Sequence, residues 1–311
     1  MGFIEPKAEI IREADLYKRI EIAARTCYKS ENKICEGSAE KMVNFLMKRG
    51  HMSPLEHSDI VFETNASTAL AVDNIAATYT EETALPHFVR KSFAQGSNTY
   101  IYSANLRAWL ALSKFSQNWF NSTDNTPDIM VLEAPIAIPL RVCNVGKPII
   151  VFRRWTNPSV LPFSADIEAR HTIVTARFTC DRAVSHELVR HRCLSFSQLS
   201  QRYVNYKDGI DCVQPHWWYD LDGPRDMFQT VADIASDNYA HLISQGYPPQ
   251  DARAILPNVT ATEIVVTGTQ EQWIKYVLPL RLSKAAHPDI RRLMTLFCNQ
   301  LGWDPNIFTE A

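Results

Sequence analysis

The stretch from residue 172 to residue 206 constrains the fold more than any other part of the chain. It begins T-I-V-T-A-R-F-T-C, in which every second side chain from Val174 to Cys180 is apolar and the side chains between them are polar. A period of two is typical of a β-strand with one buried face. We therefore expect a half-buried strand over residues 172–180.

A helix is predicted directly after this strand. Asp181 stands where a helix N-cap is expected, and Val184 and Leu188 lie four positions apart as an apolar stripe. We expect the helix to run from about residue 182 to residue 192. The triplet R-H-R at 190–192 then lies near its C-terminal end, and the serines that follow lie in a turn or loop.

Cations and hydroxyl groups are concentrated around the end of this helix. Residues 187–206 read E-L-V-R-H-R-C-L-S-F-S-Q-L-S-Q-R-Y-V-N-Y, and Glu187 alone cannot neutralise the arginines. Uncompensated cations repel one another, and ionised hydrogen bonds to phosphate are about twice as strong as neutral ones. Each contributes on the order of 1.5 to 3 kcal/mol. We interpret the stretch as an anion-binding site; a solvated charged face is the alternative.

Two catalytic motifs are close to this stretch but do not fit. H-E-L-V-R-H at 186–191 resembles the zinc-protease motif, but its second histidine is at i+5, roughly 140° around the helix instead of roughly 40°. We therefore expect no metal site. Ser200 has His191 nearby in sequence, but nothing marks it as an activated nucleophile. Binding through its hydroxyl and amide groups is the preferred role.

Composition excludes several classes of protein. The chain has 311 residues, a formal charge of −2 and 46% hydrophobic residues, which predicts a soluble globular protein and disfavours a bulk polyanion such as duplex DNA as partner. Seven cysteines without a C-x-x-C pair favour reduced thiols. The sequence shows no signal-peptide run and no membrane span, so a cytoplasmic location is expected. It also lacks the standard glycine-rich loops, so any nucleotide is expected to bind in another way.

Segments on either side add candidate residues. A helix is expected over 14–28, and Ser38 is expected to cap a second helix that Gly50 ends. His57, in the following G-H-M-S-P-L-E-H segment, is either a hydrogen-bonded loop residue or part of a pocket wall. The aromatic triplet W-W-Y at 217–219 either stacks on a planar ligand or packs against the core or a neighbouring subunit.

The C-terminal third is predicted to be mainly helical. A long helix is expected from Pro224 to about residue 245, and a short one around Arg253. Further helices are expected from about residue 269 and from Asp289. Residues 63–169 give less information, and we interpret them as an inserted subdomain or an extension of the same sheet.

The pattern R-H-R-x7-S at 190–200, continued as Q-R-Y, resembles the signature of the flavin-dependent thymidylate synthases, or ThyX family. Other segments resemble family segments in the same order. These are A-A-R-T-C-Y (23–28), G-H-M-S-P-L-E-H (50–57), A-R-A-I-L-P (252–257) and L-P-L-R (278–281). The resemblance covers roughly residues 15–62 and 170–300.

The resemblance implies a fold, a reaction and partners. The expected fold is α/β (α+β), with a central, mostly antiparallel sheet flanked by helices in one catalytic domain over 1–311, interrupted by an insertion at about 63–169. The implied reaction is reductive methylation of dUMP to dTMP. Methylenetetrahydrofolate supplies the one-carbon unit, and FAD reduced by NADPH supplies the hydride. The family also implies a homotetramer with shared active sites, and no nucleic acid or membrane partner.

The resemblance also implies roles for individual residues. Arg281 and Ser200 are the candidate catalytic residues, Arg281 because a fixed guanidinium beside the uracil ring stabilises developing negative charge. The candidate dUMP-binding residues are Glu187, Arg190, Gln198, Ser200, Gln201, Arg202, Arg253 and Arg281. The candidate FAD-binding residues are His57, Arg190, His191, Arg192, Gln198 and Gln270.

Departures from the family pattern and alternative functions remain open. Glu187 stands where a glutamine is frequent and Gln198 where a glutamate is frequent, which suggests an exchange of partners. Cys27 replaces a frequent serine. One alternative function is single-stranded nucleic-acid binding by the arginines and the aromatic loop. Another is a flavoprotein that acts on a different substrate.

Overall fold

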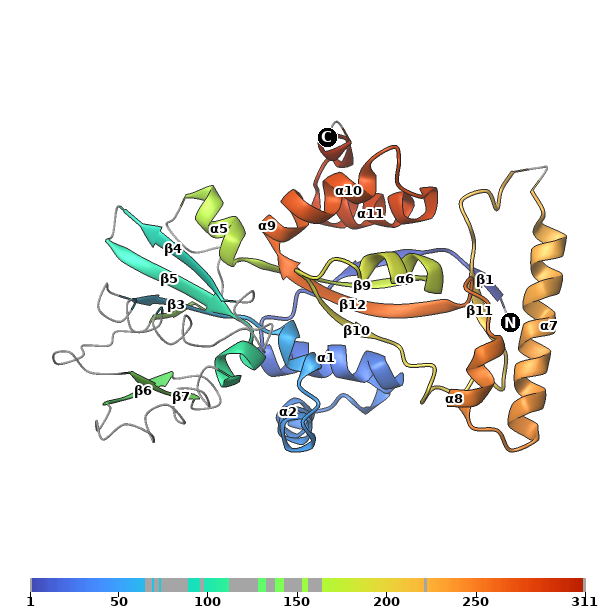
Figure 1. Cartoon of the computed structure of the whole chain (residues 1–311), viewed down its shortest axis with the longest axis horizontal. Coiled ribbons are helices and arrows are strands. Elements are labelled where there is room, and N and C mark those ends of the chain that lie inside the picture. Colours follow the sequence, from blue (N-terminus) through green and yellow to red (C-terminus); the bar gives the residue numbers. More distant parts are fainter. Residues whose placement is uncertain are drawn as a thin grey trace.

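Two long antiparallel strands form the centre of the computed structural model. These strands are β9 (Ile173–Asp181) and β12 (Ala261–Thr269), paired along their whole length. The shorter strands β10 (Ser195–Gln198) and β2 (Lys7–Ile10) complete a sheet with the order β10-β12-β9-β2, in which every neighbouring pair is antiparallel (Figure 1). The predicted strand at 172–180 and the predicted antiparallel sheet are both confirmed.

The structure describes most of the chain outside the middle region. The described residues are 2–64, 69, 73, 89–95, 98–111, 128–132, 138–142, 153–155, 164–220 and 223–309. Within this part of the chain, none of the helices is both long enough and apolar enough to cross a membrane.

Helices cover both faces of the central sheet (Figure 1). The helices above it in the view are α10 (Leu278–Leu282) and α11 (Pro288–Leu301), and those below are α1 (Leu16–Tyr28) and α2 (Ser38–Arg49). The core on the α11 side includes Phe178, Trp273 and Phe297, whose rings lie 4.5 to 6.2 Å apart. Aromatic pairs at this spacing stabilise a core beyond the area that they bury.

Local sequence sets the ends of the helices below the sheet. The carboxylate of Asp15 accepts the backbone N–H groups of Tyr17 and Lys18 and begins α1. The expected Ser38 cap of α2 is wrong, because Gly37 takes the cap position in a left-handed conformation (φ 71°) and Ser38 is the first helical residue. Gly50 ends α2 as expected, also with a φ of 71°.

A second group of elements packs around the N-terminal strand of the chain. It contains the parallel pair β1 (Gly2–Ile4) and β11 (Asp211–Val213), the long helix α7 (Arg225–Ser244), and the short helices α8 (Pro249–Ala252) and η5 (Arg253–Ile255). Trp218 stacks on Phe3 at 4.3 Å between ring centroids, and Trp217 packs edge-on to Phe228 at 5.2 Å. Both tryptophans are therefore packing residues within this chain.

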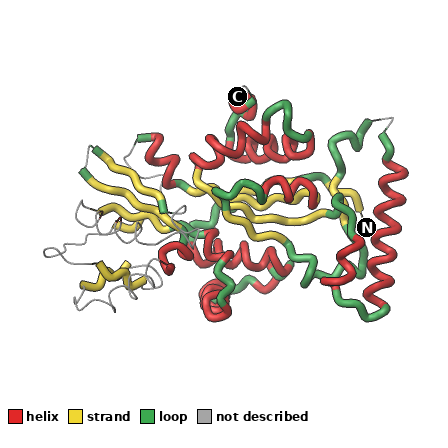
Figure 2. The backbone as a smooth tube through the Cα atoms, in the orientation of Figure 1, coloured by secondary structure: helices red, strands yellow, loops and turns green. Residues whose placement is uncertain are grey.

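A separate group of strands comes mostly from the middle region (Figure 2). It forms the sheet β4-β5-β3-β8, with strands Arg90–Ala94, Thr99–Ala104, Ile60–Thr64 and Arg153–Trp155, and the hairpin β6-β7, with strands Asp128–Leu132 and Ile138–Val142. The helix α5 (Ala165–His171) leads back to β9. Much of the expected insertion at 63–169 lies outside the described residues.

Candidate active site

The passage from β9 into α6 (Arg182–Leu188) positions the arginine-rich triplet. Asp181 caps α6 as predicted, because its carboxylate accepts the backbone N–H of Val184 across 2.6 Å. The helix ends at Leu188, one turn before the predicted end, since the next position of its apolar stripe is the exposed Arg192. The triplet at 190–192 therefore lies in the turn between α6 and β10.

Strand β10 corrects the prediction for two of the serines. Ser195 and Ser197 lie on this strand with buried side chains, and only Ser200 follows in a turn. Pairing with β12, from Ser195 opposite Thr267 to Gln198 opposite Ile264, satisfies the backbone of this polar stretch. A loop was predicted because the segment has few apolar residues, but the partner strand supplies the hydrogen bonds.

β10 is an edge strand, and the predicted site residues gather at its two ends. The turn with residues 190–192 precedes it, and Ser200 and Arg202 follow it. Gln270 follows β12 at the same end as the triplet, because Ser195 pairs with Thr267. Strands rise about 3.3 Å per residue, so the four-residue strand separates the two groups by roughly 10 Å.

Arg281 connects α10 to the end of α6. Its Nη1 donates to Oε2 of Glu187 at 2.6 Å, and its Nη2 donates to the Glu187 carbonyl at 2.9 Å. Its Nε donates to Nε2 of His191 at 2.8 Å. Three residues that the sequence assigned separately to nucleotide and flavin are thus in direct contact, and the guanidinium plane is held from three directions.

Burial and the contact with Arg281 both act on the protonation state of His191. Burial lowers the pKa of His191 to about 4, and the charge of Arg281 acts in the same direction. The ring is therefore neutral near pH 7. Because Nε2 accepts from Arg281, the proton of the neutral ring is on Nδ1, which leaves that nitrogen as a donor.

Four predicted arginines have no carboxylate partner among the residues that the structure describes. Arg190, Arg192, Arg202 and Arg253 are all exposed, and none forms an ion pair there. Arg202 lies over the ring of Tyr203 at 5.5 Å from the centroid, and Nε of Arg253 donates to the carbonyl of Gln250 at 3.1 Å. Their charges remain available to an anion, as the sequence predicted.

The turn at Ser200 is fixed against the end of α1. The Ser200 N–H donates to the Cys27 carbonyl at 3.0 Å, and the ring of Tyr203 lies 5.1 Å from that of Tyr28. The Ser200 hydroxyl accepts the backbone N–H of Arg202 at 3.3 Å, its one hydrogen bond within the described part of the chain. No base contacts this hydroxyl there, so the geometry favours a binding role. Gln201 is half-buried in the same turn.

Glu187 and Gln198 have different surroundings. Glu187 contacts Arg281, whereas Nε2 of Gln198 donates to the hydroxyl of Ser185 at 2.8 Å and lies 3.3 Å from that of Thr262. The two side chains therefore do not share a partner, and the structure leaves the expected exchange untested.

Arg182 and Tyr206 are candidate residues that the sequence did not single out. Nη1 of Arg182 lies 3.4 Å from the Leu199 carbonyl. Burial is the main cause that lowers the pKa of Arg182, and the charge of nearby Arg253 acts in the same direction. The buried Tyr206 hydroxyl has no hydrogen-bond partner among the described residues. Only the position of Arg182 in the first turn of α6 distinguished it in the sequence.

His57 lies inside the protein, against β10 and β12. It ends the short helix η2 (Ser53–His57) and is completely buried, with Nδ1 2.8 Å from the Thr267 hydroxyl and Nε2 2.9 Å from the Ser197 hydroxyl. Burial lowers the pKa of His57 to about 3. Both ring nitrogens are hydrogen-bonded, as the first of the two alternatives expected. The flavin contact of His57 stays a prediction.

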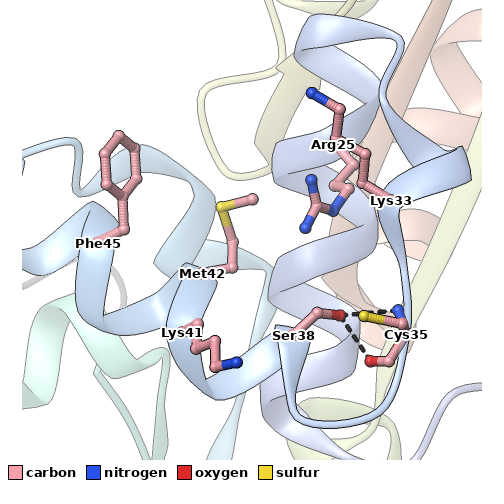
Figure 3. Close-up of a pocket in the computed structure, with 7 residues that line it drawn as sticks. All are labelled: Arg25, Lys33, Cys35, Ser38, Lys41, Met42 and Phe45. Carbon is pink, nitrogen blue, oxygen red and sulfur yellow. Dashed lines mark hydrogen bonds between the residues drawn. The ribbon is translucent and has the colours of Figure 1, made fainter.

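A separate pocket of about 330 Å³ lies between α1 and α2 (Figure 3). Its lining residues are Arg25, Lys33, Cys35, Ser38, Lys41, Met42 and Phe45. Arg25 is paired with the buried Glu21 at 2.8 Å. None of the predicted site residues lines this pocket, so it is not part of the candidate active site.

The fold and the site define an α/β protein whose central sheet has, at both ends of one edge strand, arginines that form no ion pair within the described residues. The profile of the family described as "Thymidylate synthase complementing protein" matches residues 9–80 and 168–303. These ranges contain β9, α6, β10, β12 and α10. The chain belongs to this family.

Curated relatives agree with this assignment. A flavin-dependent thymidylate synthase of Geobacter sulfurreducens is 33% identical over 198 residues, which cover 60% of this chain and 84% of the relative. One of Mycobacterium tuberculosis is 32% identical over 204 residues, covering 54% and 81%. One of a Mycobacterium species (strain KMS) is 34% identical over 185 residues, covering 51% and 71%.

Proposed function

We propose that this chain is a flavin-dependent thymidylate synthase that reductively methylates dUMP to dTMP. It is an enzyme of the methyltransferase class. The observation that carries the proposal is the position of Arg281, held by Glu187 and His191 near Arg190 and Arg192, which form no ion pair with any described residue. The family membership and the relatives' names support it independently.

The residues at both ends of β10 fit two anionic nucleotides. Exposed guanidiniums without carboxylate partners in the described part of the chain lose little when an anion binds, because no internal ion pair has to break. We assign Ser200, Gln201, Arg202 and Arg253 to the phosphate of dUMP. Arg182, which lies near Leu199 and Arg253, and Tyr206, whose hydroxyl has no partner among the described residues, are additional candidates.

At the other end, Arg190, His191, Arg192 and Gln270 are assigned to the flavin, which we take to be FAD. Bound flavin supplies the hydride. Nδ1 of neutral His191 provides a hydrogen-bond donor there without adding a charge to the guanidiniums. His57 acts on this site through Ser197 and Thr267, by fixing β10 against β12.

Arg281 is assigned to the uracil ring. Its guanidinium is 14% exposed and is oriented by the Glu187 carboxylate, the Glu187 carbonyl and His191. A preoriented cation beside a carbonyl oxygen stabilises negative charge that develops there. This role needs no covalent attack by a protein side chain, in agreement with the surroundings of Ser200. Gln198 is assigned to the boundary between the two ligands.

NADPH and methylenetetrahydrofolate are the proposed co-substrates, and a homotetramer is the proposed assembly. Met227, Val231 and Ile234 form an exposed apolar stripe on α7, with exposed fractions of 71%, 53% and 55%. An exposed apolar helix face of this kind marks a protein contact. A second copy of the chain that covers α7 or β10 would complete a site that is open on one side in the single chain.

The proposed domain layout is one catalytic unit over 1–311 with an insertion at about 63–169, in a cytoplasmic protein. The interruption of the family match between residues 80 and 168 supports the insertion. The nucleic-acid alternative has no observation in its favour, since Trp217 and Trp218 pack on Phe228 and Phe3.

The function is tested on the purified chain by its visible absorption spectrum and by an assay with dUMP, methylenetetrahydrofolate and NADPH. We expect a yellow protein that forms dTMP. A protein that takes up no flavin, or one that binds flavin but does not respond to dUMP, would overturn the proposal.

A further inference from the structure

Two histidines and an aspartate meet on the surface near the start of α11. His216 lies in the loop after β11, His287 is the N-cap of α11, and Asp289 is in its first turn. One ligand atom from each residue lies within 4.8 Å of the others. The sequence predicted no metal site. His216 and Asp289 are 73 positions apart, so only the fold brings them together.

The spacing of these atoms matches that of metal ligands. Nδ1 of His216 lies 3.4 Å from Oδ1 of Asp289, and Nδ1 of His287 lies 3.6 Å from Oδ2. These distances exceed the roughly 2.7 to 3.2 Å of a typical nitrogen–oxygen hydrogen bond. Two atoms bound tetrahedrally to one zinc ion, each at about 2.1 Å, are about 3.4 Å apart.

The surrounding structure holds the carboxylate and leaves the rings free to adjust. The backbone N–H of His216 donates to Oδ1 of Asp289 at 2.6 Å, and the Asp289 side chain is only 15% exposed. The imidazoles are 37% and 55% exposed. Small rotations of these two rings can therefore bring all three ligands to bonding distance without moving the backbone.

Charge and protonation also favour a cation. Within the described residues, Asp289 has no lysine or arginine partner, only the two imidazoles. Nδ1 of His287 accepts the Asp289 N–H at 3.3 Å, so this nitrogen carries a lone pair and no proton, and it gives up this long hydrogen bond when it binds a metal. The N-terminal end of a helix disfavours a cation, and the Asp289 carboxylate offsets that effect.

We propose that His216, His287 and Asp289 bind one divalent cation of the zinc class, with the fourth coordination position open to water. Imidazole and carboxylate ligands in this combination suit zinc. The cation links the loop after β11 to the segment that joins α10 and α11, which begins directly after the helix that carries Arg281. Its expected effect is to stabilise this junction.

The experiment uses the full chain, stripped of metal with a chelator and titrated with Zn²⁺ in a calorimeter and with Co²⁺ in a spectrophotometer. We expect one Zn²⁺ per chain, four-coordinate Co²⁺ absorption bands and a higher melting temperature with Zn²⁺. Loss of an outer-shell partner typically weakens metal binding about 10- to 100-fold. Loss of a direct ligand in His216→Ala or His287→Ala should therefore weaken it at least about 100-fold.

Two further variants separate metal binding from folding and from other zinc ligands. Asp289→Asn keeps an acceptor for the His216 N–H but loses the charge, so it should fold normally and bind Zn²⁺ more weakly. His51→Ala removes an exposed histidine elsewhere and should bind Zn²⁺ as the wild type does. The proposal is overturned if the wild type binds no Zn²⁺, or if a variant with both His216→Ala and His287→Ala still binds one equivalent. If the exposed Cys35 thiol held the zinc instead, the double variant would still bind one equivalent.

Discussion

Arg281 donates from Nε to Nε2 of His191 across 2.8 Å, although the two residues are 90 positions apart in the chain. This contact joins the helix α10 to the turn that carries the arginine triplet. It orients a charged guanidinium, and it adds to the main effect of burial in lowering the pKa of the imidazole, because a nearby positive charge disfavours protonation.

Replacing Arg281 with glutamine should therefore raise the pKa of His191 above its present value of about 4. Burial, the larger cause of the low pKa, remains, but the charge of Arg281 is lost. Titration of the imidazole followed by NMR measures the shift, and dTMP formation should fall strongly in the same variant. An unchanged pKa of His191 would contradict the described contact.

The two ends of β10 should respond separately to mutation. Arg202→Ala should weaken dUMP binding by about 10- to 100-fold, the loss expected for one charged hydrogen bond, and leave bound flavin nearly unchanged. Arg192→Ala should weaken flavin binding and leave dUMP binding nearly unchanged. Equilibrium titrations with dUMP and flavin measure both effects.

Lys207→Ala is the matched control, because it removes an exposed cation five residues after Arg202. It should change neither affinity by more than a small factor. Equal effects of Arg202→Ala and Arg192→Ala on both ligands would show that the two groups form one undivided site.

Ser200→Ala should lower turnover without abolishing it. No base contacts the Ser200 hydroxyl among the described residues, and its observed hydrogen bond is to the backbone of Arg202. Loss of that hydroxyl removes one binding contact, worth roughly 1 kcal/mol or about a fivefold change. Steady-state kinetics measure the effect, and complete loss of turnover with both ligands still bound would support a nucleophilic serine.

Stability should fall as the medium is acidified below the ordinary imidazole range. Burial lowers the pKa of His57 and of His171 to about 3, whereas an imidazole in the unfolded chain has a pKa of about 6.5. Between these values the unfolded state binds more protons, so the stability present above about pH 6.5 is progressively lost towards about pH 3.

Urea unfolding at a series of pH values in this window measures the slope. His57→Gln should give a shallower slope than the wild type, because one buried imidazole fewer takes up a proton on unfolding. His51→Ala, at an exposed histidine, is the control. If His57→Gln has the same slope as the wild type, His57 is not held neutral in the folded protein.

Val231→Asp should disrupt the proposed assembly. Val231 lies at the centre of the exposed stripe on α7, and burying an unpaired carboxylate in an apolar contact is unfavourable. Sedimentation velocity should show smaller species than for the wild type. Asn44→Asp, which adds the same charge at an exposed position of α2, should leave the assembly intact. An unchanged mass for Val231→Asp would place the subunit contact elsewhere.

Local sequence patterns determined much of the secondary structure. The alternation over 172–180 produced β9, Asp181 capped α6, and Gly50 ended α2, because each of these features depends on residues that are close in the chain. The arginine triplet and Ser200 were also recognisable as candidate site residues, since their charges and hydroxyls have too few apolar or acidic neighbours to be explained by packing.

Tertiary structure decided which of these side chains meet. β10 is a strand only because β12 lies beside it, and the length of β10 separates the two groups of site residues. His57 is an interior residue because Ser197 and Thr267 occupy both its nitrogens. Contacts of this kind join residues far apart in the chain, so no local period or spacing encodes them.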